Sequence, residues 1–589
     1  MAYITKRKNR EGKYYVYLVE GYREKDKVRT RILKAYGQLD LLEAEEAGAY
    51  ERLRQEAKDG LIGNPELKEI TVTYQLDESI SYDDKNYGWQ LFDNLYYELG
   101  ISKVIHARMR KTKTEFDVDE VLRLLAFQRI LNPGSKLATV ASQNELFGNW
   151  KVNENAMYRS LTHLDELKEA IQLRIHKTIT DKIGRVATLV FYDVTNYRFE
   201  IDINDEDMVD EVTGVITDGL RKKGVCKSNG KNPIVQMGLF MDTNGIPICY
   251  KLFRGNMPDV STYREAVRQV KEQYGIERIV VVADKAMNSG NNIYETSENK
   301  DGWLFSQKHR GTRGVSKKLQ EFILDPSGWQ FNENVTFGQK SMIRERTIKT
   351  SDKPTKTKKV TEKVLVTWSE KYANREQKRR DGAIDYAKKL TNPEIFRMTC
   401  KKGGKKYLEL YMLDKETNEK KPFTPFIELD QEAIDFDAIF DGINVLVTSE
   451  LGMSEEEIMR NYKELAKIED NFRITKTDFE SRPVYVKKPN HIDAHFLSCF
   501  VALVLMRIIQ HQIGHSMSAA KIINAVQSAH ANTLTNGFYR VQANDNMQEL
   551  NRLLGVDWDK AIVTHEQLKS YASTVFTTLE KSEKSSETT

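Results

Sequence analysis

The sequence predicts an α/β protein with a mixed sheet, and two apolar segments that each end at an aspartate carry this prediction. Residues 186–192 form a continuous, largely apolar run closed by Asp193. Residues 279–283 form a second, wholly apolar run closed by Asp284. Continuous apolar runs of this length are typical of strands that are buried on both faces. We therefore expect two core strands, each with an acid at its carboxyl end.

The segment between those strands predicts a hairpin followed by a helix. Residues 234–241 and 246–253 are apolar, and the Asn244-Gly245 pair between them is a strong hairpin signal. Residues 262–274 have helical periodicity. A crossover helix between parallel strands is right-handed almost without exception, so the last strand should lie beside the first. This βββαβ order is the layout of a ribonuclease-H-like fold, whose active site takes a third acid from a later helix.

Glu469 is the candidate for that third acid. Tyr462, Glu469 and Lys476 recur at seven-residue intervals, a spacing that puts three side chains on one stripe of an α-helix. The neighbouring stripe is apolar and consists of Ile458, Leu465 and Phe472. On this segment alone, a surface glutamate of an amphipathic helix is the simpler interpretation. Asp193 and Asp284 elsewhere in the chain favour a functional one.

Three carboxylates at one sheet edge are suited to divalent cations, because Mg²⁺ and Mn²⁺ prefer oxygen ligands. We expect two ions in this site, with Asp193 bridging both, Asp284 holding one and Glu469 the other. Two such ions activate a water or a 3′-hydroxyl and stabilise the departing oxygen of a phosphodiester. The three acids are therefore the predicted catalytic and metal-binding residues.

A chain of 589 residues is too long for one hydrophobic core. The pattern divides it into five regions. Residues 1–60 are expected to form a basic β-meander plus helix, and residues 61–185 a helical region that binds DNA. Residues 186–309 with 436–515 are expected to form the catalytic core, residues 310–435 a β-rich basic insertion, and residues 516–589 a C-terminal helical region with a disordered tail from residue 580. An insertion of this size is tolerated because loop-closure entropy grows slowly with length.

The net charge of +4 is unevenly distributed. Residues 1–36 carry eleven Lys or Arg against four acids, and residues 341–380 carry thirteen against five. Such blocks indicate contact with a polyanion, although a charged run is more often a solvated face. The second block supplies four candidate DNA contacts: Lys358, Lys359, Arg379 and Arg380.

The remaining composition excludes several classes of protein. Four dispersed cysteines without a CxxC pair argue against a disulfide framework and against a cysteine zinc site. No apolar run approaches the roughly eighteen residues of a membrane span, and the polar N-terminus lacks a secretory segment. We therefore expect a cytoplasmic protein.

The segment Tyr462-x2-Leu465-x3-Glu469-x6-Lys476 resembles the Tyr-Arg-Glu-Lys signature of DDE transposases from bacterial insertion sequences, in the superfamily of insertion sequence four. Leu465 stands where that signature has Arg. Other segments resemble one branch of the superfamily, named after insertion sequence sixteen-thirty-four: Phe191-Tyr-Asp193-Val-Thr195, Phe253-Arg-Gly-Asn256, Val282-Ala-Asp284-Lys285, Phe440 with Asp441-Gly442, and Arg482-Pro-Val484 ahead of His495.

The resemblance implies cut-and-paste transposition, in which DNA is cleaved at terminal inverted repeats and joined to target DNA. It implies that Asp193, Asp284 and Glu469 are the DDE triad. Tyr462 and Lys476 match positions that contact phosphates, and Arg473 is a candidate replacement for the missing Arg. The implied partners are double-stranded DNA and a second copy of the chain in a synaptic homodimer, in a bacterial cytoplasm and at the nucleoid when bound to DNA.

Two alternatives stay open. A catalytically silent, transposase-derived DNA-binding protein would bind without cleaving, although three intact acids argue against it. A ribonuclease-H-like nuclease would cleave without strand transfer, but it has no need for the basic insertion. A haloacid-dehalogenase-like phosphatase is disfavoured, because Thr195 stands where that enzyme needs a second Asp.

Overall fold

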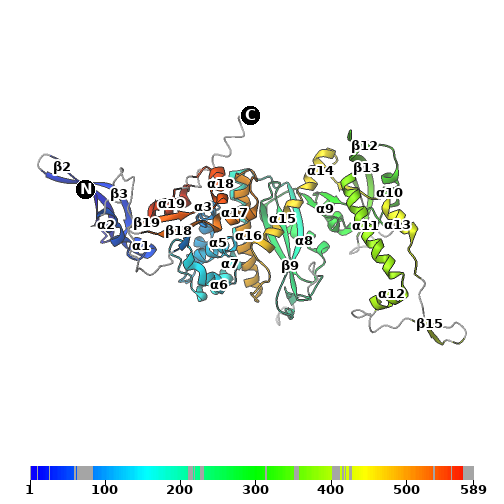
Figure 1. Ribbon diagram of the computed structural model, residues 1–589, viewed down its shortest axis with the longest axis horizontal. Coiled ribbons are helices and arrows are strands. Elements are labelled where there is room, and N and C mark those ends of the chain that lie inside the picture. Colours follow the sequence, from blue (N-terminus) through cyan, green and yellow to red (C-terminus); the bar gives the residue numbers. More distant parts are fainter. Residues whose placement is uncertain are drawn as a thin grey trace. The chain divides into compact units, whose positions relative to one another are not determined.

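The computed structural model describes residues 2–9, 11–24, 27–58, 62, 84–209, 216–217, 219–225, 231–311, 315–350, 357–400, 411–413, 417, 419–422, 427–534, 537–556, 558 and 560–574. The predicted disordered tail, residues 580–589, lies outside them. The chain forms two compact units, unit 1 (Met1–Ile276 with Ala466–Thr589) and unit 2 (Glu277–Leu465). Both units combine helices with strands, as predicted for an α/β protein (Figure 1).

The N-terminal meander is confirmed. Strands β1 (Ala2–Lys8), β2 (Tyr14–Glu24) and β3 (Lys27–Gln38) form an antiparallel sheet in that order. The helical stretch that follows is two helices, α1 (Leu39–Glu45) and α2 (Ala49–Lys58). Apolar side chains alternate along β2, and Val16 and Leu18 pack with Leu53 of α2. The meander thus has a small core of its own.

A helical body follows the meander in unit 1. It contains β4 (Asp84–Asn86), α3 (Gln90–Glu98), α4 (Ile101–Met109), α5 (Val118–Leu131), α6 (Lys136–Ser142), η1 (Gln143–Glu145) and α7 (Glu154–Ile183). Residues 118–131 are strongly periodic in the sequence, which predicts a helix, and α5 has these same bounds. Its N-cap Asp117 accepts hydrogen bonds from the backbone N–H groups of Asp119 and Glu120. Helix α7 ends at Gly184, whose φ of +74° favours glycine.

The strands of unit 1 that were predicted for the core form an antiparallel array. Strands β5 (Leu189–Arg198), β8 (Ile234–Met241) and β9 (Pro247–Arg254) lie in that order, and α8 (Asp259–Tyr274) follows. The prediction that the first strand ends at Asp193 is wrong. Strand β5 pairs with β8 as far as Arg198, so Asp193 lies in its middle. The short strands β6 (Met208–Val209) and β7 (Ile216–Thr217) pair with each other.

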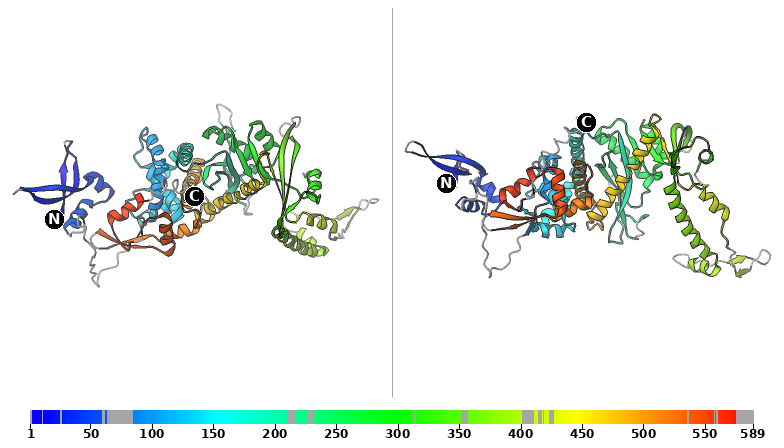
Figure 2. Two further views of the ribbon diagram at one scale, coloured as in Figure 1. Left: turned by 90° about the horizontal axis from the view of Figure 1, so that it is seen from above. Right: turned by 45° about the horizontal axis from the view of Figure 1, so that its top comes forward.

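The C-terminal part of unit 1 consists of α15 (Ala466–Arg473), the π-helical turn η4 (Ile474–Asp478), α16 (Pro489–Gln512), α17 (Ala519–Gln527), β18 (His530–Thr533), β19 (Phe538–Gln542), α18 (Asp545–Leu554), β20 (Ile562–Thr564) and α19 (His565–Thr574). Residues 495–509 are largely apolar in the sequence, which predicts a helix that covers the sheet, and they lie within α16. Helix α16 packs against β9, α5 and α7. The long helices α7 and α16 lie side by side (Figure 2).

Helix α16 corrects the expectation that no apolar run reaches membrane-span length. It is the one candidate span in the described part of the chain, with a window of mean hydropathy 1.9. Charged residues such as Arg507 interrupt the apolar run in the sequence, but the mean hydropathy of the helix stays high. Because 94% of the window is buried inside the structure, α16 is a core helix.

Unit 2 has a mixed sheet. Its strands lie in the order β12 (Gln330–Phe331), β13 (Phe337–Lys349), β14 (Thr357–Ser369), β17 (Ile443–Thr448), β11 (Gly302–Ser306) and β10 (Val280–Ala283). Strands β10 and β11 are parallel, and the other pairs are antiparallel. The strands from the predicted insertion therefore continue the sheet beside β17. Strands β15 (Tyr411–Leu413) and β16 (Lys420–Pro422) form a separate pair.

The helices of unit 2 are η2 (Lys285–Met287), α9 (Gly290–Glu298), α10 (Lys317–Leu324), α11 (Glu370–Leu390), α12 (Pro393–Cys400), α13 (Gln431–Ala438) and α14 (Glu455–Lys463). Helix α11 was not predicted from the sequence, and it has no buried residue. Figure 2 shows α11 extending away from the strands of unit 2. Seven of its twenty-one residues are Lys or Arg, so it carries much of the second basic block.

Candidate functional site

Asp193 lies on the face of β5 that meets α15 and η4. Alternate side chains of a strand share a face, so Asp193, Thr195 and Tyr197 point the same way. The Nζ of Lys476 in η4 donates a hydrogen bond to Thr195 Oγ1. The hydroxyls of Tyr197 and Thr475 share a hydrogen bond of 2.9 Å. Helix α15 also packs against β5, so the half-buried Asp193 faces the segment that carries Glu469.

The opposite face of β5 is covered by α8. The Tyr192 hydroxyl shares a hydrogen bond of 2.8 Å with Thr262 Oγ1, and burial raises the pKa of Tyr192 well above its usual value. Asp193 itself accepts a hydrogen bond of 2.7 Å from the backbone N–H of Val194. The strand is therefore held rigidly from both sides, which fixes the position of Asp193.

Glu469 and its neighbour Asp470 have opposite environments. Asp470 accepts bonds from Arg473 Nε at 2.9 Å and from Arg507 at 2.8 Å. Burial opposes its ionisation, but both guanidinium groups lower the pKa of the Asp470 carboxyl. Glu469 is exposed, and none of the described residues forms a hydrogen bond or ion pair with its carboxylate. Asp470 is thus a structural acid, whereas Glu469 is available to a ligand.

Asn471 fixes α15 on the turn between β8 and β9. It is fully buried and donates a hydrogen bond of 3.2 Å to the carbonyl of Gly245, the predicted hairpin glycine. Its side-chain oxygen accepts from Arg507 Nε at 2.5 Å. Arg507 therefore orients two consecutive residues of α15, Asp470 and Asn471, and so sets the direction in which Glu469 projects.

The prediction of one helix carrying Tyr462, Glu469 and Lys476 on a single stripe is wrong. Helix α14 ends at Lys463, α15 begins at Ala466, and Lys476 lies in a π-helical turn. The backbone N–H of Phe479 donates to the carbonyl of Ile474, five residues earlier. The Thr475 hydroxyl donates to the carbonyl of Phe472, a bond that competes with the regular helix ladder. The apolar stripe was predicted correctly: Ile458, Leu465 and Phe472 are buried.

Asp284 lies in unit 2, directly after β10, as predicted. It is the N-cap of η2, and its carboxylate accepts a hydrogen bond of 2.6 Å from the backbone N–H of Lys285. The side chain is exposed. Across the described residues, no group of three or more His, Cys, Asp and Glu is gathered closely enough to hold a metal ion. The metal-binding role of the three acids stays a prediction.

Some of the candidate DNA contacts already form ion pairs with other side chains of the protein. Lys358 pairs with Glu298 at 2.5 Å, and Lys359 pairs with Glu345 at 2.8 Å. Arg380 is half-buried and held by Asp441 at 2.6 Å, whereas Arg379 is exposed on α11. Arg473 bonds Asp470 and Asp478. Tyr462 is half-buried at the end of α14. Arg380 is thus better explained as a structural residue.

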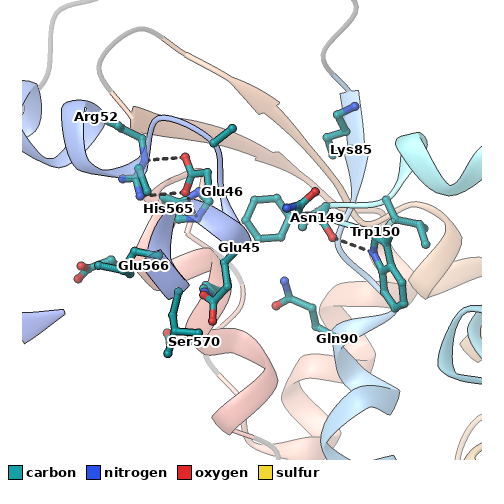
Figure 3. Close-up of a pocket in the computed structure, with 18 of the residues that line it drawn as sticks. Glu45, Glu46, Arg52, Lys85, Gln90, Asn149, Trp150, His565, Glu566 and Ser570 are labelled. Atoms are coloured by element: carbon teal, nitrogen blue, oxygen red, sulfur yellow. Dashed lines mark hydrogen bonds and ion pairs between the residues drawn. The ribbon is translucent and has the colours of Figure 1, made fainter. Parts of the chain in front are cut away.

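A large cleft of about 1040 Å³ lies in unit 1 beside the N-terminal meander. Figure 3 shows Arg52 paired with Glu46, next to His565 of α19. Lys34 of β3 also pairs with Glu566. Five acids and five bases line the cleft: Glu45, Glu46, Asp93, Glu120 and Glu566 with Lys34, Arg52, Lys85, Arg123 and Lys569. Because the acidic and basic side chains named here are equal in number, their charges favour neither an anion nor a cation.

Comparisons with known proteins agree with the features described above. A family model described as "Transposase DDE domain" matches residues 212–505. A second, described as "IS1634 family transposase, N-terminal domain", matches residues 3–62, which include the meander. The first match defines the class, a transposase with a DDE domain. With the second match, the chain belongs to the IS1634 family of DDE transposases, the family that the motifs resemble.

Solved structures give weaker likenesses. The piggyBac transposase synaptic complex with hairpin DNA matches with 9% identity and a TM-score of 0.32, over 86% of this chain and 88% of that one. The Mos1 transposase paired-end complex with left transposon end matches with 13% identity and a TM-score of 0.14, over 37% and 74%. No curated protein matches the chain.

Proposed function

We propose that this transposase moves its element by cut-and-paste transposition. In this reaction the terminal inverted repeats are cleaved and the freed 3′-hydroxyls are joined to target DNA. The observation that supports a catalytic role best is the contrast on α15. Glu469 is exposed and unpaired among the described residues, while the adjacent Asp470 is held by two arginines. Helix α15 packs on the strand that carries Asp193.

We infer that Asp193, Asp284 and Glu469 are the catalytic triad of a ribonuclease-H-like core. The donor set fits Mg²⁺ or Mn²⁺, because all three side chains offer carboxylate oxygens. When bound, two such ions supply Lewis-acid activation of the attacking hydroxyl and charge stabilisation of the departing oxygen. The chain's own contribution is to fix Asp193 on a rigid strand and to aim Glu469 through the Arg507 contacts.

Lys476 is proposed to hold a phosphate next to the reacting one. Its ammonium lies 5.4 Å from the ring centroid of Tyr197 and 5.9 Å from that of Phe472. These contacts and the bond to Thr195 keep the charge beside the strand of Asp193. An ammonium positioned in this way suits backbone contact, which fixes the register of DNA without reading its sequence. Tyr462 and Arg473 are proposed as further backbone contacts.

Recognition of the element ends is proposed to rest mainly on residues 1 to about 120, with help from residues 341–380. The meander supports this, because its strands carry Lys6, Arg7 and Lys8 beside Tyr14 and Tyr17. We expect two copies of the chain on two paired ends. Deleting residues 1–37 should abolish binding to a duplex of the inverted repeat; unchanged binding would overturn this part of the proposal.

The test of the chemistry is a metal-dependent cleavage assay on a duplex that carries one element end. Asp193→Asn, Asp284→Asn and Glu469→Gln should each lower the rate about a thousandfold or more, because metal-ion stabilisation is worth several kcal/mol and each 1.36 kcal/mol is tenfold. Binding to the same duplex should persist. Glu456→Gln, which changes an exposed acid of α14 that has no role in the proposed site, is the matched control and should cleave normally.

The outcomes separate the proposed reaction from its alternatives. Cleavage followed by joining to a target plasmid supports transposition. Cleavage without joining under any metal favours a nuclease, and binding without cleavage by the natural chain favours a silent DNA-binding protein. Normal cleavage by any of the three triad variants would refute the assignment of that residue.

A further inference from the structure

A pocket of about 170 Å³ in unit 1 is lined by side chains that no assigned role uses. Arg129 comes from α5, Lys136 from the start of α6, Arg482 from the segment after η4, and His495 from α16. Glu480 and Tyr485 also line it and are exposed, so the pocket reaches the surface. A water occupies about 30 Å³ in the liquid, so a tetrahedral oxyanion fits this volume.

The deep wall of the pocket is cationic. Lys136 is 4% exposed and Arg129 is 5% exposed. Arg129 donates to the carbonyl oxygens of Phe479 at 3.3 Å and Gly134 at 2.8 Å. Lys136 Nζ lies 3.3 Å from His495 Nδ1, while His495 Nε2 lies 3.2 Å from the carbonyl oxygen of Ser481. Nε2 therefore donates to Ser481, and Lys136 donates to the unprotonated Nδ1.

These two buried cations have no counter-charge in the described part of the chain. Neither Arg129 nor Lys136 forms an ion pair with a carboxylate there, and the Glu480 side chain is exposed at the rim. Burying a charge without a partner is costly, and the group shifts its pKa instead. Burial, together with the charge of Arg129, lowers the pKa of Lys136 to about 7. An anion in the pocket would restore the full charge of Lys136.

The pocket is connected by hydrogen bonds to the strand of Asp193. The Ser481 hydroxyl donates to the carbonyl of Thr475 at 2.6 Å, and Thr475 bonds the Tyr197 hydroxyl on β5. Lys476, the neighbour of Thr475, bonds Thr195 on the same strand. One continuous network therefore runs from the proposed catalytic strand through η4 to His495 and Lys136.

We propose that this pocket binds one phosphate group, with Lys136 and Arg482 as its direct contacts and Arg129 behind them. Arg482 is half-buried and offers the planar fork that suits phosphate oxygens. The source of the phosphate rests on the proposed function: in a transposase it is a backbone phosphate of the bound DNA. Free inorganic phosphate has the same chemistry and is distinguished by the second arm of the test.

The first arm measures thermal unfolding of the full chain in sodium phosphate and in sodium chloride at matched ionic strength. The natural chain should melt higher in phosphate. Lys136→Met and Arg482→Gln should lose most of this phosphate-specific shift, while the surface control Lys521→Met should keep it. Lys136→Met should melt at least as high as the natural chain in chloride, because it removes a buried charge. A merely structural lysine would instead lower the melting temperature in both salts.

The second arm measures binding to an element-end duplex as a function of salt. Each lost phosphate contact lowers the salt slope by about one. A lower slope in Lys136→Met with no change in Lys521→Met assigns the pocket to DNA. An unchanged slope together with a lost phosphate-specific shift assigns it to free phosphate. Equal shifts and equal slopes in all four proteins would overturn the proposal.

The outcome is independent of the triad assay. A chain that keeps the phosphate-specific shift but never cleaves element ends contradicts the proposed transposition and supports the pocket. A chain that cleaves normally with no shift and no change in slope supports transposition and refutes the pocket.

Discussion

Two buried clusters in unit 1 each contain an arginine and a histidine, but they differ in net charge. In the first, Arg185 lies between Asp242, bonded at 2.7 Å, and His176, 3.4 Å from its Nδ1. Asp242 also accepts from the backbone N–H groups of Asn244 and Ile246. The second cluster is Arg129, Lys136 and His495, which has the same pairing of cations with a neutral imidazole but lacks the carboxylate.

This difference in net charge separates structural from functional charges in this protein. The first cluster compensates itself and fixes the β8–β9 turn on which α15 rests. The second has an excess of buried positive charge and a pocket beside it. The adjacent acids on α15 repeat the contrast, with Asp470 compensated and Glu469 not. Buried charges with a partner in the described chain stabilise the fold, and charges that lack one there are the strongest candidates for ligand contact.

The largest expected effect is on the compensated cluster. Asp242→Asn keeps the shape of the side chain but leaves Arg185 buried without its counter-charge, which should lower the free energy of unfolding by about 3–5 kcal/mol. Urea denaturation measures this. The double variant Arg185→Met with Asp242→Asn should recover much of the loss. A loss of less than about 1 kcal/mol in Asp242→Asn would contradict the inference that the carboxylate compensates Arg185.

The second prediction concerns acid pH. Burial and the neighbouring Arg185 lower the pKa of His176 to about 4, and the other groups around the ring are Lys177 and Tyr274. The unfolded chain takes up a proton below about pH 6.5 and the folded chain does not. Stability is therefore lost as the pH falls from 7 towards 4, by about 2 kcal/mol between pH 7 and 5. The free energy of unfolding of His176→Gln, measured by denaturation, should not show this loss at acid pH. The same pH dependence in the variant and the natural chain would contradict the prediction.

The third prediction concerns alkaline pH and the uncompensated cluster. Because the pKa of Lys136 is lowered to about 7, the unfolded chain binds more protons between pH 7 and about 10.5. Stability should therefore rise with pH, by about 2 kcal/mol between pH 7 and 9. The other charged or titratable groups around Lys136 are Arg129, His495, Cys499, Arg482 and Glu480. The rise should be absent in Lys136→Met and reduced in phosphate; a rise of the same size in Lys136→Met would assign it to other groups.

The smallest effect is expected for Arg473. Its guanidinium bonds Asp470 and Asp478, but the side chain is 46% exposed, and exposed ion pairs contribute about 0–1 kcal/mol. Arg473→Ala should therefore lower the free energy of unfolding by less than about 1 kcal/mol in chemical denaturation. Arg507→Met, which removes the buried partner of Asp470, should cost more. The reverse order would show that exposure does not set the strength of these pairs.

The bounds of an element were predicted correctly where one local signal in the sequence was sufficient. The bounds of α5 and β8 match the predicted segments, because helical periodicity and a continuous apolar run each report burial directly. Asp284 follows β10 as expected. The prediction failed where pairing decided the outcome. Strand β5 continues past Asp193 because β8 offers partners as far as Ile234, and no local signal in Val194 or Thr195 ends the strand.

The candidate acids were proposed from the sequence, but their surroundings could not be predicted from it. The π-helical turn that carries Lys476 depends on the hydroxyl of Thr475, whose partner Tyr197 is 278 residues away. The cationic pocket draws on α5, α6 and α16, so no spacing along the chain reveals it. Arg482 and His495 stand in motifs that resemble the family, but these motifs give no indication that Lys136 lies beside them.

The family and the α/β class could be predicted from the sequence alone, and the three candidate acids were proposed from it, because motif residues and apolar periodicity are properties of the chain. Which charges have a partner depends on the tertiary structure. Compensation depends on atoms that meet within about 4 Å after folding, at distances where the low dielectric of the interior makes a missing partner costly. The contrasts between Glu469 and Asp470, and between Lys136 and Arg185, are of this kind.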